Sequence, residues 1–449
     1  MIVADRLKGI GRQVRQSDFA RHVLKLGGGN VLAQLMLLAS GPFLARLYAP
    51  DAFGVFAIYS AVFAALTLFA TLQYEAALLL PRYHRQAVCL LILILVFCPV
   101  AALTVGIPIV IFRDSVAMLL GVPALADWLW LLPISIMLIG WYQALRYWTM
   151  RREAFGDVAR NAVVRTALGA GSALAMGVWQ PFPEAPEAGL ILSHVIGETV
   201  GNLLLAFRVL QRDRDVIFWP SGRRFLAMAR RWRRFALMLV PSQGVAMCYG
   251  HLPVVAIGFL FGATAAGHYA WAERFAVAPA LLVAAAIGDV YRQRATVDYH
   301  RHGRFDRLMR RTLAVTTALA APPYIIGIMI APWLFSWLFG AAWVEAGVLA
   351  QILMVGGLVS FVIKPVDHAT IICEKTGFIF CWQLARLLLK LTSVGLVAAL
   401  DGSLHMLIWM IVIARIGLYL IDVAYCYHLA KGGSPNRPRS SSPMAPPST

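Results

Sequence analysis

Charged residues are scarce in this chain of 449 residues, and acidic ones are the scarcest. Only 14% of the residues are charged, with 22 Asp and Glu against 40 Lys and Arg, while 60% are hydrophobic. Apolar runs longer than about 18 residues recur along the chain, which excludes a soluble globular domain and indicates membrane-spanning helices. The composition therefore predicts a polytopic membrane protein.

Motifs for metal binding and nucleotide hydrolysis are also missing. The six cysteines lie in or beside apolar stretches without a Cys-x-x-Cys pair, so neither a disulfide framework nor a zinc site is indicated. The chain has no Gly-x-x-x-x-Gly-Lys-Ser/Thr loop, no Gly-x-Ser-x-Gly elbow and no His-Glu-x-x-His helix. We therefore expect no ATP hydrolysis, no metal and no cofactor.

Twelve membrane spans are expected between residues 26 and 429, which predicts an all-α integral membrane protein. Most of the 40 Lys and Arg residues fall in cytoplasmic segments if the N-terminus lies inside, and only Arg46 and Arg113 fall in outer loops. Both termini are then cytoplasmic. These basic loops also explain the net charge of +18 by attraction to anionic inner-leaflet lipids, so no nucleic-acid partner is expected.

The expected spans divide into two six-helix bundles. Laying the chain over itself with a shift of 213 residues places Gly54 on Gly267, which indicates parallel repeats related by a pseudo-two-fold axis along the membrane normal, with a site between them. Ser221 is expected to cap an interfacial helix in the linker. The expected parts are a basic cytoplasmic N-terminus (1–25), the first bundle (26–210), a basic linker (211–233), the second bundle (234–431) and a disordered cytoplasmic tail (432–449).

Five basic residues lie inside the expected spans: Arg165, Arg274, Arg386, Lys390 and Arg415. Each central cation costs about 2.5 to 3.5 kcal/mol to insert, so these residues must snorkel, pair or face water. Arg386 and Lys390 are four residues apart and share a helix face. Cationic faces suit an anionic substrate, because guanidinium groups bind phosphate oxygens bidentately. The alternatives are snorkelling of Arg165 and structural ion pairs within the second bundle for Arg386, Lys390 and Arg415.

Four residues are candidates for ion coupling. His194 and Glu198 lie one turn apart on the same face as Asn202, a spacing that suits a proton-binding site. A pair between Glu198 and Arg165 is the alternative. Glu273 is expected about two turns into the eighth span, and Glu75 near the inner interface, where local pairing is the alternative.

The stretch from Leu44 to Arg82 predicts a helical hairpin. Pro50 ends the first helix, and Asp51 suits the second as cap and first-turn anion, with that helix running to Tyr74 and Glu75. The pieces Ala45-Arg46, Pro50-x-x-Phe53-Gly54 and Tyr74-Glu75-x-Ala77 resemble the opening hairpin of the polysaccharide and O-antigen (Wzx-like) flippases. These belong to the multidrug/oligosaccharidyl-lipid/polysaccharide exporter superfamily.

That resemblance implies a function. It implies a flippase that moves a polyprenyl-diphosphate-linked oligosaccharide from the inner to the outer leaflet of the bacterial cytoplasmic membrane, for O-antigen, capsule or exopolysaccharide synthesis. Alternating access would be driven by a proton or sodium gradient, with Arg46 at the outer corner of the hairpin and Glu75 at its inner end. A polysaccharide polymerase and glycosyltransferases of the same pathway are the implied partners.

Two other functions remain open. A drug or toxin antiporter of the same superfamily would have the same spans, but its cavity should be rich in carboxylates, whereas basic residues outnumber central acids here. A membrane glycan polymerase or transferase should carry a substantial outer loop or a cluster of catalytic groups. The longest expected outer loop, Phe112 to Ala126, is short. We therefore expect a transporter and not an enzyme.

Overall fold

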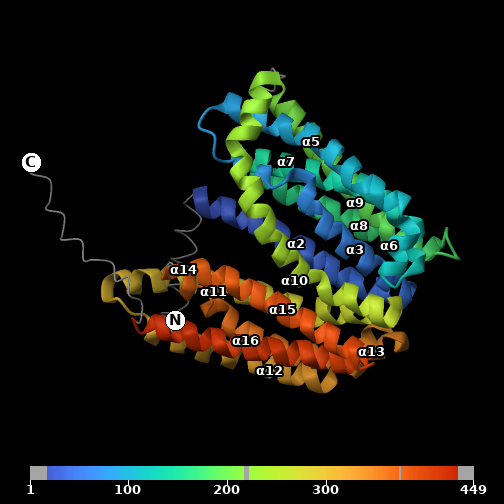
Figure 1. The fold of residues 1–449 in the computed structure, drawn as a ribbon, viewed down its shortest axis with the longest axis vertical. Coiled ribbons are helices and arrows are strands. Elements are labelled where there is room, and N and C mark those ends of the chain that lie inside the picture. The colour runs from blue at the N-terminus through green and yellow to red at the C-terminus, as the bar shows by residue number, and fades with distance from the viewer. Residues whose placement is uncertain (1–17, 217–221, 374–375, 433–449) are drawn as a thin grey trace, which may run out of the picture. The chain divides into compact units, whose positions relative to one another are not determined.

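The computed structural model describes residues 18–216, 222–373 and 376–432, and every regular element within these ranges is a helix (Figure 1). Eleven helices are long and apolar enough to cross a membrane. The prediction of an all-helical, multi-pass membrane protein is therefore confirmed. The chain forms two compact units, which meet in sequence between Gly267 and His268.

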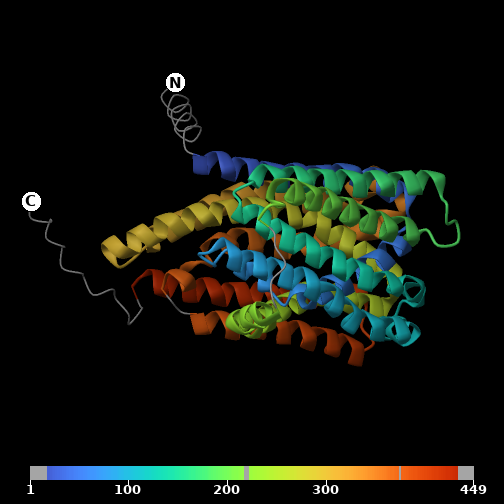
Figure 2. The ribbon, with the colours of Figure 1, turned by 90° about the horizontal axis from the view of Figure 1, so that it is seen from above.

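The first unit contains the helices up to most of α10. They are α2 (Asp18–Leu47), α3 (Pro50–Thr71), α4 (Tyr74–Ala77), α5 (His84–Ile111), α6 (Arg113–Leu119), η1 (Pro123–Leu131), α7 (Leu132–Arg151), α8 (Phe155–Trp179), α9 (Glu187–Asp213) and α10 (Gly222–Ala276). Helix α2 packs along α8, and α8 packs along α9 (Figure 2).

The second unit contains the end of α10 and the remaining helices. They are α11 (Ala278–His302), α12 (Asp306–Phe339), η2 (Ala341–Trp343), α13 (Val344–Ile363), η3 (Lys364–Val366), α14 (Ala369–Ile372), α15 (Thr376–Ala399) and α16 (Leu404–Ala430). Helix α13 packs against both α12 and α16, and α15 packs against α16.

The predicted opening hairpin is present, with two corrections. Ala49 occupies the N-cap position of α3, and Asp51 lies in the first turn, where its Oδ1 accepts a hydrogen bond from the amide of Ala52 at 2.8 Å. Asp51 is thus the first-turn anion but not the cap. Helix α3 ends at Thr71 and not at Glu75, because Leu72 and Gln73 adopt left-handed backbone angles with φ of 47° and 62°.

The eighth expected span, 266–290, is divided in the structure. The helical stretch that follows the break at Gly262 (φ 84°, ψ 177°) ends at Ala276, and α11 begins at Ala278. Helix α11 does not count among the eleven candidates, since charged residues such as Asp289, Arg292 and Asp298 occupy its second half. This helix is the difference between the eleven candidate spans and the twelve expected.

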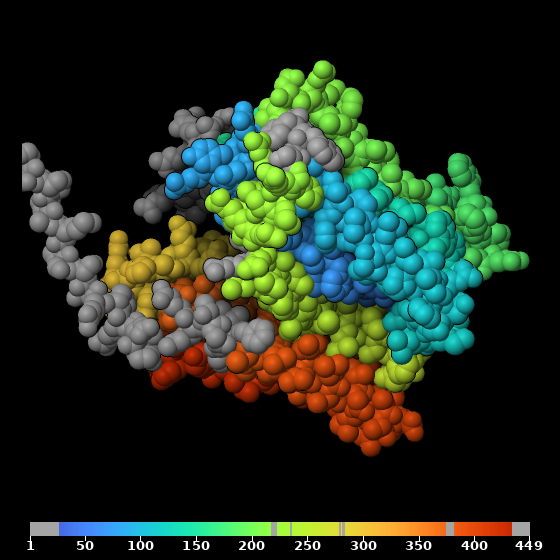
Figure 3. Space-filling view, turned by 45° about the horizontal axis from the view of Figure 1, so that its top comes forward, coloured from blue at the N-terminus to red at the C-terminus, as the bar shows by residue number. Residues whose placement is uncertain are grey.

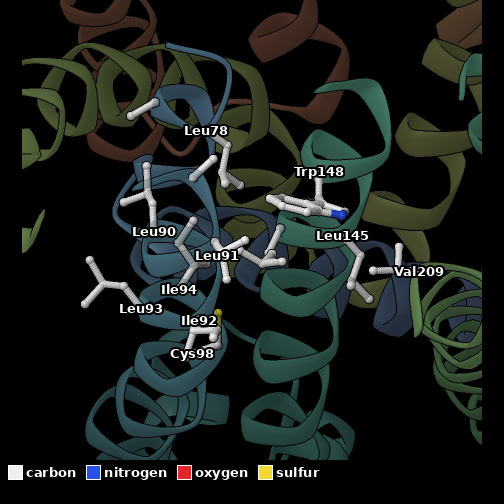
Figure 4. Packing of buried hydrophobic residues seen from close by; sticks show 14 of the residues in the cluster. Leu78, Leu90, Leu91, Ile92, Leu93, Ile94, Cys98, Leu145, Trp148 and Val209 are labelled. Carbon is white, nitrogen blue, oxygen red and sulfur yellow. The ribbon is translucent and has the colours of Figure 1, made fainter. Parts of the chain in front are cut away.

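A buried apolar cluster joins α4, α5, α7 and α9 in the first unit (Figure 4). Leu78, Leu90 and Trp148 are fully enclosed in it. The indole Nε1 of Trp148 donates to Asp213 Oδ2 at 2.9 Å, so its one polar atom is satisfied. This cluster fixes the first half of α5 and the last halves of α7 and α9 relative to one another.

Parts of the expected domain organisation lie outside the described residues: positions 1–17, Ser221 within the linker, and 433–449. The basic linker stretch that is described begins α10, so a helix leads directly into the seventh span. The expected domain limits remain predictions.

Candidate functional site

In the first unit, the structure brings Arg165 and Glu198 together. Arg165 Nη1 lies 2.7 Å from Glu198 Oε1 across the α8–α9 contact, and the Glu198 side chain is only 7% exposed. Two glycines of α9 allow α8 to approach closely at Arg165, since a Cβ at Gly201 would lie 3.1 Å from Cγ and Cδ of Arg165 and one at Gly197 would lie 3.0 Å from its carbonyl oxygen. The pair that the sequence offered as an alternative is therefore the arrangement observed.

Neighbouring polar groups hold this pair in place. The Arg165 guanidinium lies over the ring of Tyr142 of α7, 4.6 Å from its centroid. Asn161 Nδ2 donates to the carbonyl oxygen of Gly201 at 2.7 Å, and Asn202 Nδ2 donates to that of Leu138 at 2.9 Å. These bonds fasten α7, α8 and α9 to one another around the ion pair.

Several buried polar atoms of the pair and of nearby residues are left without partners. Asn161 Oδ1, His194 Nε2, Glu198 Oε2 and Asn202 Oδ1 have no hydrogen-bond partner among the described residues. The His194 ring packs edge-on to Phe63 and Phe56 of α3, at centroid distances of 5.2 and 6.1 Å. Since buried acceptors in native proteins normally have partners, this set is chemically suited to take up a proton or a small cation. The described residues hold no cluster of three His, Cys, Asp or Glu that could bind a metal ion.

In the second unit, a carboxylate and two cations come together from three helices. Glu273, at the end of α10, interacts electrostatically with Arg415 of α16 and Lys390 of α15. The Lys390 residue is only 6% exposed. The sequence predicted these three charges singly, and the structure groups them with an excess of positive charge.

Arg386 has its own partner, which sequence reasoning did not place in the site. Its Nη2 lies 3.2 Å from Oδ2 of Asp422, a fully buried side chain of α16. The guanidinium also lies over the rings of Tyr419 and Trp382, at 5.1 and 5.8 Å. Asp422 is the only acidic residue in α16, and that scarcity is the signal that could have identified it.

The other predicted residues lie elsewhere. Arg274 lies over the Trp271 ring at 5.7 Å and makes no ion pair with any residue that the structure describes. Arg46 is exposed in the last turn of α2. Glu75 is buried in α4, where removal from water raises the pKa of its carboxyl more than the hydrogen bond with Thr71 lowers it.

A family model described as "Polysaccharide biosynthesis protein" matches residues 43–348, which is most of the sequence. The chain belongs to the polysaccharide biosynthesis protein family. The likeness to this group of transporters, predicted from the opening hairpin, is confirmed.

The relatives of this polysaccharide biosynthesis protein that are described next are named as transporters or flippases. The chain is 25% identical over 390 residues to the succinoglycan biosynthesis transport protein ExoT of Rhizobium meliloti (strain 1021), covering 84% of this chain and 74% of that protein. It superposes on an inward-facing MATE family multidrug resistance transporter of the MOP superfamily with TM-score 0.61 and 16% identity, covering 88% and 93% of the two chains.

A second fold relative is the lipid II flippase MurJ in an inward closed conformation. Its TM-score is 0.67 at 10% identity, with 90% of this chain and 86% of MurJ covered. These superpositions establish a fold shared with MATE transporters and MurJ. The prediction that the chain is a transporter and not an enzyme agrees with these matches.

Proposed function

We propose that this protein is a flippase. It moves a polyprenyl-diphosphate-linked oligosaccharide from the inner to the outer leaflet of the bacterial cytoplasmic membrane, for the synthesis of a surface polysaccharide such as O-antigen, capsule or exopolysaccharide. Family membership supports the pathway, and ExoT is a relative whose name describes transport in succinoglycan biosynthesis. A polymerase and glycosyltransferases of the pathway are its proposed partners.

One observation carries the proposal of an anionic substrate: the surplus of positive charge buried in the second unit. Lys390 and Arg415 both interact with the carboxylate of Glu273. Arg386 pairs with Asp422, and Arg274 adds a further cation. A membrane site whose charged side chains are mostly cationic favours a ligand that brings negative charge, as a diphosphate does. The cavity of a cationic-drug antiporter should have the opposite excess.

Ion coupling is proposed at Glu198. Among the described residues, its Oε2 and the nearby Nε2 of His194 are buried and have no hydrogen-bond partner, while Arg165 contacts only the other carboxylate oxygen. A proton or a sodium ion taken up here would compete with Arg165 for the carboxylate. Binding of the ion therefore weakens the link between α8 and α9, which is a physical route from a gradient to a change of conformation. Glu273 and Glu75 are proposed as further coupling residues.

A reciprocal contact supports the proposed two-fold repeat of six-helix bundles. A Cβ added at Gly54 would collide with the carbonyl oxygen of Ala263, and one added at Gly267 would collide with that of Pro50. The shift of 213 residues relates Pro50 to Ala263 and Gly54 to Gly267. Such mutual contact between equivalent positions is what a two-fold axis produces. In this proposal, residues 263–276 and the first part of α11 form the eighth of twelve spans, and both termini are cytoplasmic.

The test is a translocation assay in sealed proteoliposomes with a fluorescent polyprenyl-diphosphate oligosaccharide, read by an impermeant quencher, with and without an imposed pH or sodium gradient. We expect translocation that depends on the protein and is accelerated by one gradient. Lys390→Gln and Arg415→Gln should each slow it about tenfold or more, because a charge-assisted hydrogen bond contributes about 1.5–3 kcal/mol. Arg294→Gln, an exposed position on α11, is the matched control.

Two outcomes would point to the rival functions. Efflux of a cationic dye under the same gradient, with no movement of the lipid-linked sugar, would favour a drug antiporter. Transfer or polymerisation of the glycan without translocation would favour a membrane transferase.

A further inference from the structure

An apolar groove runs along the first unit between α5, α7 and α9. Its volume is about 450 Å³, within the range of ligand pockets, and its walls include Ile92 and Val96 of α5, Leu138 and Leu145 of α7, and Leu203 and Leu210 of α9. Val96, Leu203 and Leu210 are exposed, so the groove opens at the surface of the protein.

The groove occupies about half of the membrane thickness. On α9 it extends from Thr199 to Leu210, which is about 16 Å of helix against about 30 Å of hydrocarbon. Helix α9 ends at Asp213, at the proposed cytoplasmic side. The groove therefore lies in the inner leaflet, where a lipid-linked substrate starts its passage.

Most polar groups that line the groove already form hydrogen bonds within the protein. The indole Nε1 of Trp141 donates to the carbonyl oxygen of Leu95 at 3.0 Å, Thr199 Oγ1 donates to that of Val195 at 2.8 Å, and Asn202 Nδ2 donates to that of Leu138 at 2.9 Å. These bonds also fix the floor of the groove by tying α7 to α5 and α9 to α7. The remaining surface is hydrocarbon, and it suits a chain that carries no polar atoms.

Arginines lie beyond the inner end of the groove on each side. Arg85 is exposed and shares the α5 face of Ile92 and Val96, at spacings of 7 and 11 residues. Arg214 follows Leu210 by one turn and is 79% exposed on its side chain, and its Nε lies 3.8 Å from Oδ1 of the exposed Asp215. The beginning of α10 packs against α5 here, as the yellow-green and light-blue surfaces of Figure 3 show, and brings exposed Arg224 within electrostatic range of Cys89.

We infer that this groove holds the polyprenyl chain of the substrate, with its diphosphate near Arg85, Arg214 and Arg224. An apolar channel one leaflet deep that ends at three cations matches a molecule with a long hydrocarbon chain and a strongly anionic end. This inference rests on the proposed function, because membrane phospholipids share the same pattern of apolar chain and anionic head. It adds a docking place for the chain within the first unit.

The test uses a polyprenyl diphosphate that carries a photoreactive diazirine on its last isoprene unit, in phosphatidylcholine proteoliposomes. Peptides of α5, α7 and α9 should be labelled. Leu203→Trp fills the groove and should reduce labelling about tenfold, equal to about 1.4 kcal/mol of binding free energy. Leu103→Trp, at an exposed position of α5 outside the groove, is the matched control and should label normally. Val96→Trp blocks the same groove from α5 if the first variant fails to fold.

Competition separates the substrate from ordinary lipid. Unlabelled polyprenyl diphosphate should displace the probe at concentrations at which phosphatidylglycerol does not, whereas equal displacement by phosphatidylglycerol would overturn the inference. Labelling outside the three helices would overturn it as well. If the wild-type protein translocates the oligosaccharide and the groove stays unlabelled, the inference fails and the proposed function stands. Labelling of the groove without translocation would reject the function alone.

Discussion

At the scale of single residues, the membrane-embedded charges are mostly paired, and the pairs join different helices. Arg165 with Glu198 links α8 to α9, and Arg386 with Asp422 links α15 to α16. A buried pair contributes little net stability, but removing one partner leaves an uncompensated charge. These pairs therefore make helix contacts sensitive to anything that neutralises one member.

The Arg165–Glu198 pair can be measured by a double-mutant cycle. Arg165→Met should lower the free energy of unfolding by about 3–5 kcal/mol, because Glu198 would be left buried and charged. The double variant Arg165→Met/Glu198→Gln should recover most of that loss. Thermal unfolding in detergent measures both, and Arg160→Met at an exposed position of α8 serves as control. Additive losses in the cycle would contradict coupling between the two side chains.

Glu75 predicts a dependence of stability on pH. Because burial raises the pKa of this carboxyl in the folded protein, the folded state favours the protonated form. Its stabilising contribution is complete below the unfolded pKa and is lost as the pH rises through the raised value. Glu75→Gln mimics the protonated form and should not lose stability in this range.

The measurement for Glu75 is the difference in melting temperature between wild type and Glu75→Gln as a function of pH. The melting temperature of Glu75→Gln relative to wild type should rise as the pH increases from acid toward neutral. A Glu153→Gln control, at an exposed corner between α7 and α8, should show no such trend. A constant difference across the pH range would contradict a raised pKa at Glu75.

At the scale of elements, the close crossing of α3 and the helix after Gly262 depends on two glycines. Gly54→Ala places a methyl group against the Ala263 carbonyl oxygen, where backbone cannot move aside cheaply. We expect a loss of about 1–3 kcal/mol in unfolding free energy, the usual cost of overpacking. Gly171→Ala, a helical position in α8 with open space around it, is the matched control. Equal melting temperatures for the two variants would contradict the close crossing.

The sequence predicted some helix boundaries and contacts but not others. The corner at Pro50 was predictable, because proline lacks the amide hydrogen that a continuing helix needs. The end of α3 was not, since leucine and glutamine at positions 72 and 73 give no signal for a left-handed backbone. Pairing of Arg386 with Asp422 joins residues 36 positions apart on different helices, and spacing along one helix cannot predict it.

At the scale of the whole molecule, composition predicted a polytopic membrane protein, and the opening hairpin predicted its family. The structure added which buried charged residues lie together. Burial cost alone had singled out Lys390 and Arg415, and the structure adds their shared carboxylate, Glu273. The sequence did not predict the apolar groove, because its walls come from three helices and consist mostly of leucine, isoleucine and valine, which are common in any membrane helix.

The crossing at Gly54 and Gly267 has a consequence for motion. It lies where α3 begins, at the proposed outer surface, and it is made by backbone atoms. Because backbone atoms make this contact, it can separate without the repacking of interlocked side chains, and we expect the outer side to open here. Spin labels on Asp51 and Thr264, two exposed positions of the first unit that the 213-residue shift relates, should move apart when it opens.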